Sequence, residues 1–165
     1  MTIKTIEFNG VHYPAFQAEG NASQFAIPFA LQVCRGVGYD IGYGKDEWKL
    51  PGAIGIDLKD GTDALDLPEG QMDYIYSSHC LEHVPHWVEA MDHWDSRLRI
   101  GGVLFLYLPH FSQEYWRPWH NRRHVHVLTP DIIRAYLEDS GYRSDRIFIS
   151  ERDLNNSFMV MAERG

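Results

Sequence analysis

Glycines and an acidic residue stand where two apolar runs of this sequence end. Gly42 and Gly44 follow residues 38–41, and Asp57 lies at the end of residues 53–58. In an open α/β sheet, ligands bind beyond the carboxyl ends of the strands. Glycine lets the backbone approach a ligand closely, and a carboxylate accepts hydrogen bonds from two neighbouring hydroxyls. The pattern therefore predicts a site that binds a ribose.

Two more segments belong to the same predicted edge of the sheet. In residues 63–68, either Asp63 or Asp66 could accept a hydrogen bond from an adenine amino group. A third run, residues 73–77, leads directly into Ser78 and His79. Each feature has ordinary structural explanations when taken alone. Their order and spacing together predict one nucleoside-binding edge.

Residues 109–128 carry the side chains best suited to bind a second molecule. Aromatic walls with cationic groups suit a small anionic or sugar-like compound. His110, directly after a predicted strand, is the first candidate for a general base, and His79 is the second. A lid or an oligomer contact is the alternative explanation for this segment. The predicted substrate contacts are Tyr115, Trp116, Arg117, Trp119, Arg122, Arg123 and His124.

A competing interpretation is a zinc-dependent hydrolase, because residues 79–83 read His-x-x-Glu-His. That chemistry needs His79 and His83 on one helical turn, with Glu82 as the base. The preceding residues are β-prone and Pro85 follows closely, so the motif does not fit the middle of a helix. His120, His124 and His126 form a second histidine group, which is more typical of a polar surface loop. We therefore expect no metal site.

The elements that position these residues alternate along the chain. Asn9-Gly10 predicts a hairpin between residues 3–8 and 11–16, and residues 22–34 predict a helix interrupted near Pro28. This order predicts a Rossmann-like, doubly wound α/β fold. Its sheet is mostly parallel with an antiparallel C-terminal strand, and an N-terminal β-hairpin precedes it. Strands are expected at 38–41, 53–58, 73–77, 103–108, 146–150 and 157–162, and helices at 85–98 and 130–140.

In combination, the motifs resemble the class I S-adenosylmethionine-dependent methyltransferases, closest to a type 11 branch with a shortened first crossover. The resemblance covers roughly residues 36–162 and rests on Asp40-Ile41-Gly42-x-Gly44, Gly55-Ile56-Asp57 and the segments 63–68 and 72–84. It implies S-adenosylmethionine as cofactor, S-adenosylhomocysteine as product and methyl transfer to a small-molecule acceptor. The implied cofactor contacts are Asp40, Gly42, Tyr43, Gly44, Asp57, Leu58, Asp63, Leu65, Asp66, Ser78 and His79.

The sequence departs from the family pattern in its crossovers. The third glycine after Gly44 is absent, and the stretches before Asp57 and Asp73 are too short for full helices. The cofactor would then be more exposed, unless the N-terminal hairpin and helix cover it. A reduced domain that binds the cofactor or a partner protein without turnover therefore stays open beside an active methyltransferase.

Bulk composition sets the remaining expectations. The 165 residues predict one domain, with the hairpin and helix in 1–34 and the cofactor-binding core in 36–165. A net charge of −8 argues against a general nucleic-acid partner, and no apolar run is long enough to span a membrane. The two cysteines, Cys34 and Cys80, predict a reducing cytoplasm rather than a disulfide framework. The oligomeric state stays open.

Overall fold

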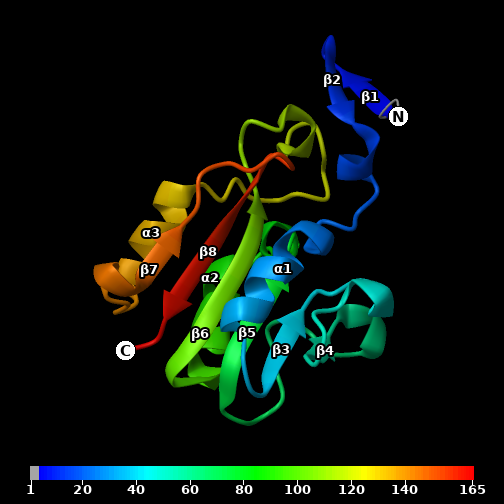
Figure 1. Cartoon of the computed structure of the whole chain (residues 1–165). Coiled ribbons are helices and arrows are strands. Elements are labelled where there is room, and N and C mark those ends of the chain that lie inside the picture. The colour runs from blue at the N-terminus through cyan, green and yellow to red at the C-terminus, as the bar shows by residue number, and fades with distance from the viewer. Residues whose placement is uncertain (1–3) are drawn as a thin grey trace.

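A six-stranded sheet forms the centre of the protein in the computed structural model, which describes residues 4–165 (Figure 1). Its strand order is β4-β3-β5-β6-β8-β7. Strand β8 alone runs opposite to the other five strands. The predicted fold class, with a mostly parallel sheet and an antiparallel C-terminal strand, is confirmed. The strands are β3 (Gly38–Ile41), β4 (Ile54–Ile56), β5 (Met72–Ser78), β6 (Leu98–Pro109), β7 (Ile147–Ile149) and β8 (Ser157–Glu163).

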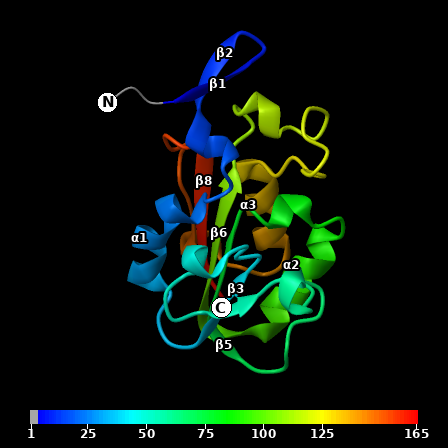
Figure 2. The same ribbon diagram turned by 90° about the vertical axis from the view of Figure 1, so that its right-hand side faces the viewer.

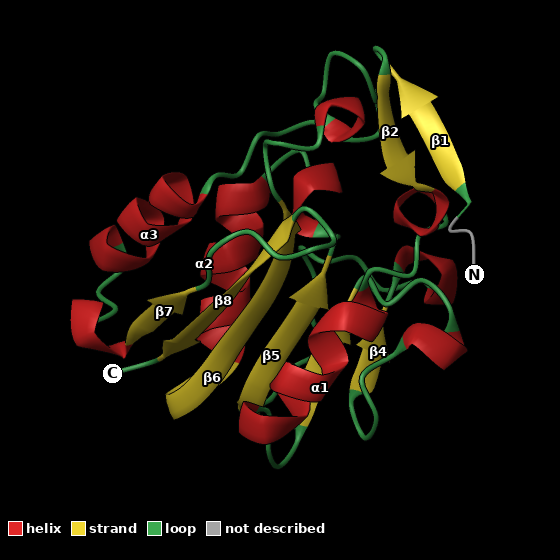
Figure 3. Ribbon diagram, turned by 45° about the horizontal axis from the view of Figure 1, so that its top comes forward, coloured by secondary structure: helices red, strands yellow, loops and turns green. Residues whose placement is uncertain are grey.

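Helices cover both faces of this sheet (Figures 2 and 3). Helix α1 (Ser23–Val33) packs on one face, and α2 (Trp87–Arg97) and α3 (Pro130–Asp139) pack on the other. Alternating side chains of the central strands separate the two cores: Ile75 joins the α2/α3 side, whereas Tyr76 joins the α1 side. Among the helices of residues 4–165, none has the length and apolar character needed to cross a membrane.

The first two crossovers of the sheet contain no α-helix, as the sequence predicted. A single 3-10 turn, Asp46–Trp48, lies between β3 and β4, and another, Leu58–Asp60, lies between β4 and β5. The carboxyl ends of β3 and β4 are therefore bordered by short loops. Any ligand at this edge meets loop backbone rather than the side of a helix.

The N-terminal hairpin packs on the segment that follows β6. Strands β1 (Thr5–Phe8) and β2 (Val11–Pro14) are joined by Asn9 and Gly10, both with the positive φ that a type I′ turn requires. The Phe8 ring lies edge-on to His120 with 4.8 Å between centroids, and Tyr13 lies edge-on to Tyr115 at 5.2 Å. The hairpin thus supports residues 114–120. Met1, Thr2 and Ile3, the last of which was expected in the hairpin, lie outside the described residues.

The boundary between α2 and β6 lies earlier than expected, because the helix was expected to end at 98 and the next strand to begin at 103. The helix ends at Arg97, and β6 begins at Leu98. Gly101 and Gly102 instead exchange backbone hydrogen bonds with Arg164, at 2.7 and 2.9 Å. Pairing with the C-terminal strand therefore extends β6 through the glycines.

Helix α3 begins with a cap whose removal should be measurable. The Thr129 hydroxyl accepts a hydrogen bond from the Ile132 N–H at 3.3 Å, and Pro130 occupies the first helical position. We expect Thr129→Ala to lower the free energy of unfolding by about 1 kcal/mol in urea denaturation. Thr129→Ser keeps the hydroxyl and should lose much less. Equal losses in the two variants would contradict a capping role.

Candidate functional site

Hydrogen bonds between loops and strands gather the predicted residues at one edge of the sheet. The Gly42 N–H donates to the Ile56 carbonyl at 2.7 Å, and the Ser77 hydroxyl donates to the Ile41 carbonyl at 2.9 Å. These bonds lock the carboxyl ends of β3, β4 and β5 together. The glycine turn, the end of β4 and the loop after β5 consequently surround a common hollow.

This hollow is a cavity of about 300 Å3, which we call the first cavity. Its walls come from the glycine turn, the end of β4, residues 62–65 and the loop 79–85. Six of the predicted cofactor contacts line it: Gly42, Asp57, Leu58, Asp63, Leu65 and His79. All six come from the strand ends and loops that the sequence predicted at this edge of the sheet.

The shape of the first cavity depends on the absence of a side chain at Gly42. Gly42 has a φ of +76°, and a Cβ at this position would collide with the side chain of Cys80. At the rim, Leu58 exposes 73% of its surface. The backbone of Gly42 therefore forms one wall of the cavity, and the exposed side chain of Leu58 lies at another.

Asp57 is held in a fixed orientation within this cavity. Its Oδ2 accepts a hydrogen bond from the Gly44 N–H at 2.9 Å, and its Oδ1 accepts one from the Lys59 N–H at 3.1 Å. Each carboxylate oxygen can accept a further hydrogen bond. Asp57 can therefore receive two hydroxyl groups from a ligand without changing its conformation.

Five predicted cofactor contacts are not among the described residues that line the first cavity: Asp40, Tyr43, Gly44, Asp66 and Ser78. Gly44 acts indirectly, through its bond to Asp57. Tyr43 is buried, and its hydroxyl donates to Asp60. Asp66 is exposed, whereas Ser78 is buried.

Asp40 binds a backbone N–H of the protein and does not line the first cavity. It is fully buried, and its Oδ2 accepts a hydrogen bond from the Leu50 N–H at 2.7 Å. Burial raises the pKa of Asp40 to about 7. Asp40 therefore fixes the loop after the glycine turn, a role that the motif alone does not distinguish from ligand contact.

A second cavity, of about 270 Å3, adjoins the first. His79 and His83 line both, so the two cavities meet at these side chains. Among the predicted substrate contacts, Tyr115, Trp116, Arg123 and His124 line the second cavity. The opposite wall consists of residues 16–18, which follow the N-terminal hairpin.

Sequence reasoning missed two polar residues of the second cavity, Gln17 and Asn155. Both are buried, and neither the Gln17 Nε2 nor the Asn155 Oδ1 has a hydrogen-bond partner among residues 4–165. An unpaired buried polar group is costly, so these atoms are suited to bind a polar ligand. Neither residue belongs to a motif, and the two come together only in the folded chain, where both line the second cavity.

Four of the predicted catalytic and substrate residues line neither the first nor the second cavity: His110, Arg117, Trp119 and Arg122. His110 and Arg117 line a smaller pocket of about 20 Å3 that shares Trp116 and His124 with the second cavity. The His110 Nδ1 lies 2.9 Å from the Ser112 hydroxyl. Arg117 donates to the Phe111 carbonyl and lies over the Phe111 ring. Trp119 and Arg122 are exposed. Local hydrogen bonds hold the side chains of His110 and Arg117 within residues 110–117.

His79 forms the partition between the two cavities. Its backbone has a φ of +46°, which is uncommon for a residue other than glycine. The ring packs edge-on against Trp116 with 5.0 Å between centroids, and its Nε2 lies 2.9 Å from the Ser157 hydroxyl. Burial lowers the pKa of His79 to about 3, so the ring is neutral and a weak base.

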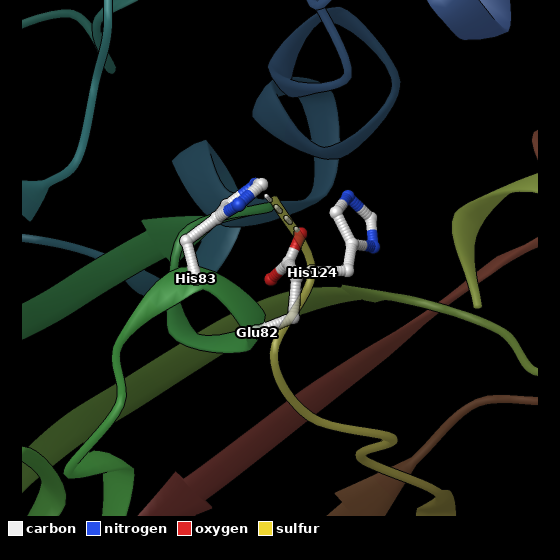
Figure 4. Close-up of side chains that lie close together, drawn as sticks. All are labelled: Glu82, His83 and His124. Carbon is white, nitrogen blue, oxygen red and sulfur yellow. Dashed lines mark ion pairs between the residues drawn. The ribbon is translucent and has the colours of Figure 1, made fainter. Parts of the chain in front are cut away.

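The His-x-x-Glu-His motif does not adopt the helical arrangement of a zinc hydrolase. Residues Leu81–His83 form one 3-10 turn, and His79 precedes it with a positive φ. Glu82 instead lies with His83 and His124, whose ligand atoms are all within 4.8 Å of one another (Figure 4). Burial raises the pKa of Glu82 to about 8 and lowers that of His124 to about 4. Each of the two predicted histidine groups contributes part of this cluster, and the sequence predicted neither the combination nor its location.

Comparison with known proteins agrees with this geometry. The family described as methyltransferase domain matches residues 19–146. No curated protein sequence matches the chain. This match spans more than half of the chain and therefore establishes the family of this protein.

Solved structures share the fold at low sequence identity. A SAM-dependent methyltransferase from Archaeoglobus fulgidus superposes with a TM-score of 0.66 at 16% identity, covering 90% of this chain and 98% of that one. A SAM-dependent methyltransferase from Thermotoga maritima, described as a possible histamine N-methyltransferase, gives 0.69 at 13%, covering 90% and 91%. Magnesium protoporphyrin IX methyltransferase from Synechocystis with bound SAM gives 0.61 at 16%, covering 92% and 80%. With the motifs, the fold and the family match in agreement, the chain belongs to the methyltransferase domain family and shares the fold of class I S-adenosylmethionine-dependent methyltransferases.

Proposed function

We propose that the first cavity binds S-adenosylmethionine and that its methyl group passes to a small anionic or sugar-like acceptor in the second cavity. The observation that carries this proposal is the junction of the two cavities at His79 and His83. Methyl transfer is an in-line displacement, so donor and acceptor must approach from opposite sides of one methyl group. Two adjoining cavities supply that arrangement.

The walls of the first cavity suit each part of the cofactor. The Gly42 backbone would lie beside the methionine and ribose, and Asp57 would accept the ribose hydroxyls. The exposed Leu58 would pack on the adenine, and Asp63, rather than Asp66, lines the cavity where the adenine amino group would lie. The sulfonium would then stand beside His79.

The second cavity combines aromatic walls with polar groups. Tyr115 and Trp116 supply flat apolar surface, Arg123 supplies positive charge, and Gln17 and Asn155 supply unpaired polar atoms. This combination favours a small acceptor that carries hydroxyl or anionic groups. Because burial keeps the pKa of His79 so low, His79 is better suited to position the acceptor than to remove its proton.

A catalytically reduced domain is the second candidate, and the missing crossover helices motivate it. Such a domain would bind the cofactor without turning it over. The presence of an acceptor cavity against the sulfonium end favours the active enzyme. For its location we propose the cytoplasm, because Cys34 and Cys80 are both free thiols.

Loss of the ribose contact should weaken cofactor binding strongly. Hydrogen bonds to a charged group contribute about 1.5–3 kcal/mol, so we expect Asp57→Ala to bind S-adenosylhomocysteine at least tenfold more weakly in calorimetric titration. Asp66→Asn, a change at an acid outside the cavity wall, should bind like the wild type. The absence of binding by the wild-type chain, or equal affinity in both variants, would refute the proposed cofactor site.

A pair of glycine variants separates close approach at the cofactor from backbone strain. Gly42 and Gly52 both have a positive φ, but a Cβ on Gly52 meets no atom within 4 Å. We expect both Gly42→Ala and Gly52→Ala to lose about 1 kcal/mol of unfolding free energy or more, because alanine is strained at this φ. Only Gly42→Ala should lose affinity for S-adenosylhomocysteine. A similar loss of affinity in Gly52→Ala would show that the effect comes from general destabilisation.

Turnover distinguishes the active enzyme from the reduced domain. We expect transfer of a labelled methyl group to at least one member of a panel of hydroxylated carboxylates and sugars. Arg123→Ala should reduce the rate with anionic acceptors while leaving the affinity for S-adenosylhomocysteine unchanged, because Arg123 lines only the second cavity. Cofactor binding without transfer to any member would favour the reduced domain.

A further inference from the structure

Near the junction of the two cavities, Glu82 carries a buried carboxyl group that forms no hydrogen bond within the described residues. Glu82 is fully buried, and neither of its oxygens has a hydrogen-bond partner among the described residues. Its Oε1 lies 3.7 Å from the Nδ1 of His79 and 3.7 Å from the Nε2 of His83, which is too far for a hydrogen bond. A buried carboxylate without partners is costly unless a cation compensates it.

Two histidines present nitrogen atoms to this carboxylate. Figure 4 shows His83 and His124 on either side of the Glu82 carboxylate, and the three ligand atoms lie within 4.8 Å of one another. Two ligands on one ion, with bonds of about 2.1 Å, lie about 3.0–3.4 Å apart. The side chains therefore need only a small movement to close around an ion, and the partly exposed His83 can provide it.

A hydrogen bond to the backbone orients the His83 ring for binding a metal ion. Its Nδ1 lies 2.7 Å from the Arg123 carbonyl, which can only accept, so the ring donates there and leaves the Nε2 lone pair facing Glu82. Histidines that bind metals commonly donate their other nitrogen to a carbonyl in this way. Arg123 thus contributes to the cluster through its backbone, independently of its side chain.

We propose that Glu82, His83 and His124 bind a divalent first-row transition cation at the junction of the two cavities. Two imidazole nitrogens with one carboxylate favour Zn2+, Fe2+ or Co2+ over Mg2+ and Ca2+, which prefer oxygen ligands. Three protein ligands leave coordination positions open. Because His83 and His124 line the second cavity, those positions face the acceptor.

This inference rests on the proposed function and deepens it by naming the acceptor atom. The acceptor carries a hydroxyl oxygen beside a second oxygen donor, so that both oxygens bind the cation together. The cation lowers the pKa of the hydroxyl, which releases its proton to water. The oxygen lone pair then forms the bond to the methyl carbon while the carbon–sulfur bond breaks. Its electron pair stays on sulfur, which becomes the neutral thioether of S-adenosylhomocysteine.

Cobalt provides a direct test, because its visible absorption reports the ligands that it binds. Co2+ is titrated into the untagged, metal-free full chain, and we expect saturation at one equivalent, with Zn2+ displacing the Co2+. Glu82→Gln and His124→Ala should weaken Co2+ binding at least tenfold. His120→Ala and His126→Ala are matched controls from the same histidine-rich segment and should bind like the wild type.

The outcomes are decided by the variants that remain folded in thermal denaturation. His83→Ala alters a partly exposed side chain and keeps the test valid if Glu82→Gln does not fold. Absence of saturable Co2+ binding by the wild type, or unchanged affinity in both His83→Ala and His124→Ala, would overturn the metal site. S-adenosylhomocysteine should bind the metal-free chain as well. Loss of the metal site alone therefore leaves the proposed function standing, whereas loss of S-adenosylhomocysteine binding removes the proposed function.

The acceptor class has a test of its own on the Co2+-loaded chain. 3,4-Dihydroxybenzoate should shift the Co2+ absorption bands, because its neighbouring oxygens bind the ion together. 3-Hydroxybenzoate, with a single hydroxyl, should produce a much smaller shift. Equal shifts from the two compounds, or no shift from either, would reject an acceptor with paired oxygens.

Discussion

The parallel register of β3, β4 and β5 is the constraint on which the site depends. Hydrogen bonds from Gly42 to Ile56 and from Ser77 to Ile41 place three strand ends at one level. The N–H of Gly44 then fixes the Asp57 carboxylate at that level. Ligand contacts that are far apart in the sequence thereby face one cavity, although the first two crossover helices of the fold are missing.

The N-terminal segment contributes to the second cavity and not to the first. The hairpin packs through Phe8 and Tyr13 against the segment after β6, and the turn behind it brings Gln17 into the second cavity. Of the two alternatives, an exposed cofactor or one covered by the hairpin and helix, the structure favours the first, since the N-terminal residues at the cavities line only the second: Phe16, Gln17, Ala18, Gly20 and Ala22. The N-terminal segment shapes the place where the acceptor is proposed to bind.

Local sequence signals predicted the framework well, because they depend on short-range physics. The Asn9-Gly10 turn, the Thr129-Pro130 helix start and the glycine turn at Gly42 each follow from backbone conformation within a few residues. The positions of Asp57 and Asp63 at the cavity follow from the strand order.

The features that the sequence did not predict depend on contacts between residues that are far apart in the chain. His110 follows a strand end as a base should, but its Nδ1 lies next to the Ser112 hydroxyl and the ring lines a smaller pocket beside the second cavity. Asn155 and Gln17 belong to no motif, and only tertiary contacts bring them together. The His-x-x-Glu-His motif was considered as a unit, whereas the fold replaces His79 with His124 from a segment about forty residues later. An orphaned carboxylate such as Glu82 is visible only once burial is known.

In the proposed reaction, donor and acceptor meet at His79, between the two cavities. A crystal structure of the chain with S-adenosylhomocysteine would locate the donor relative to the second cavity. We expect the ribose hydroxyls on Asp57, the adenine beside Leu58 and the sulfur next to His79, facing the cavity lined by Tyr115 and Asn155. A sulfur atom directed away from that cavity, or a ligand bound outside the first cavity, would contradict it.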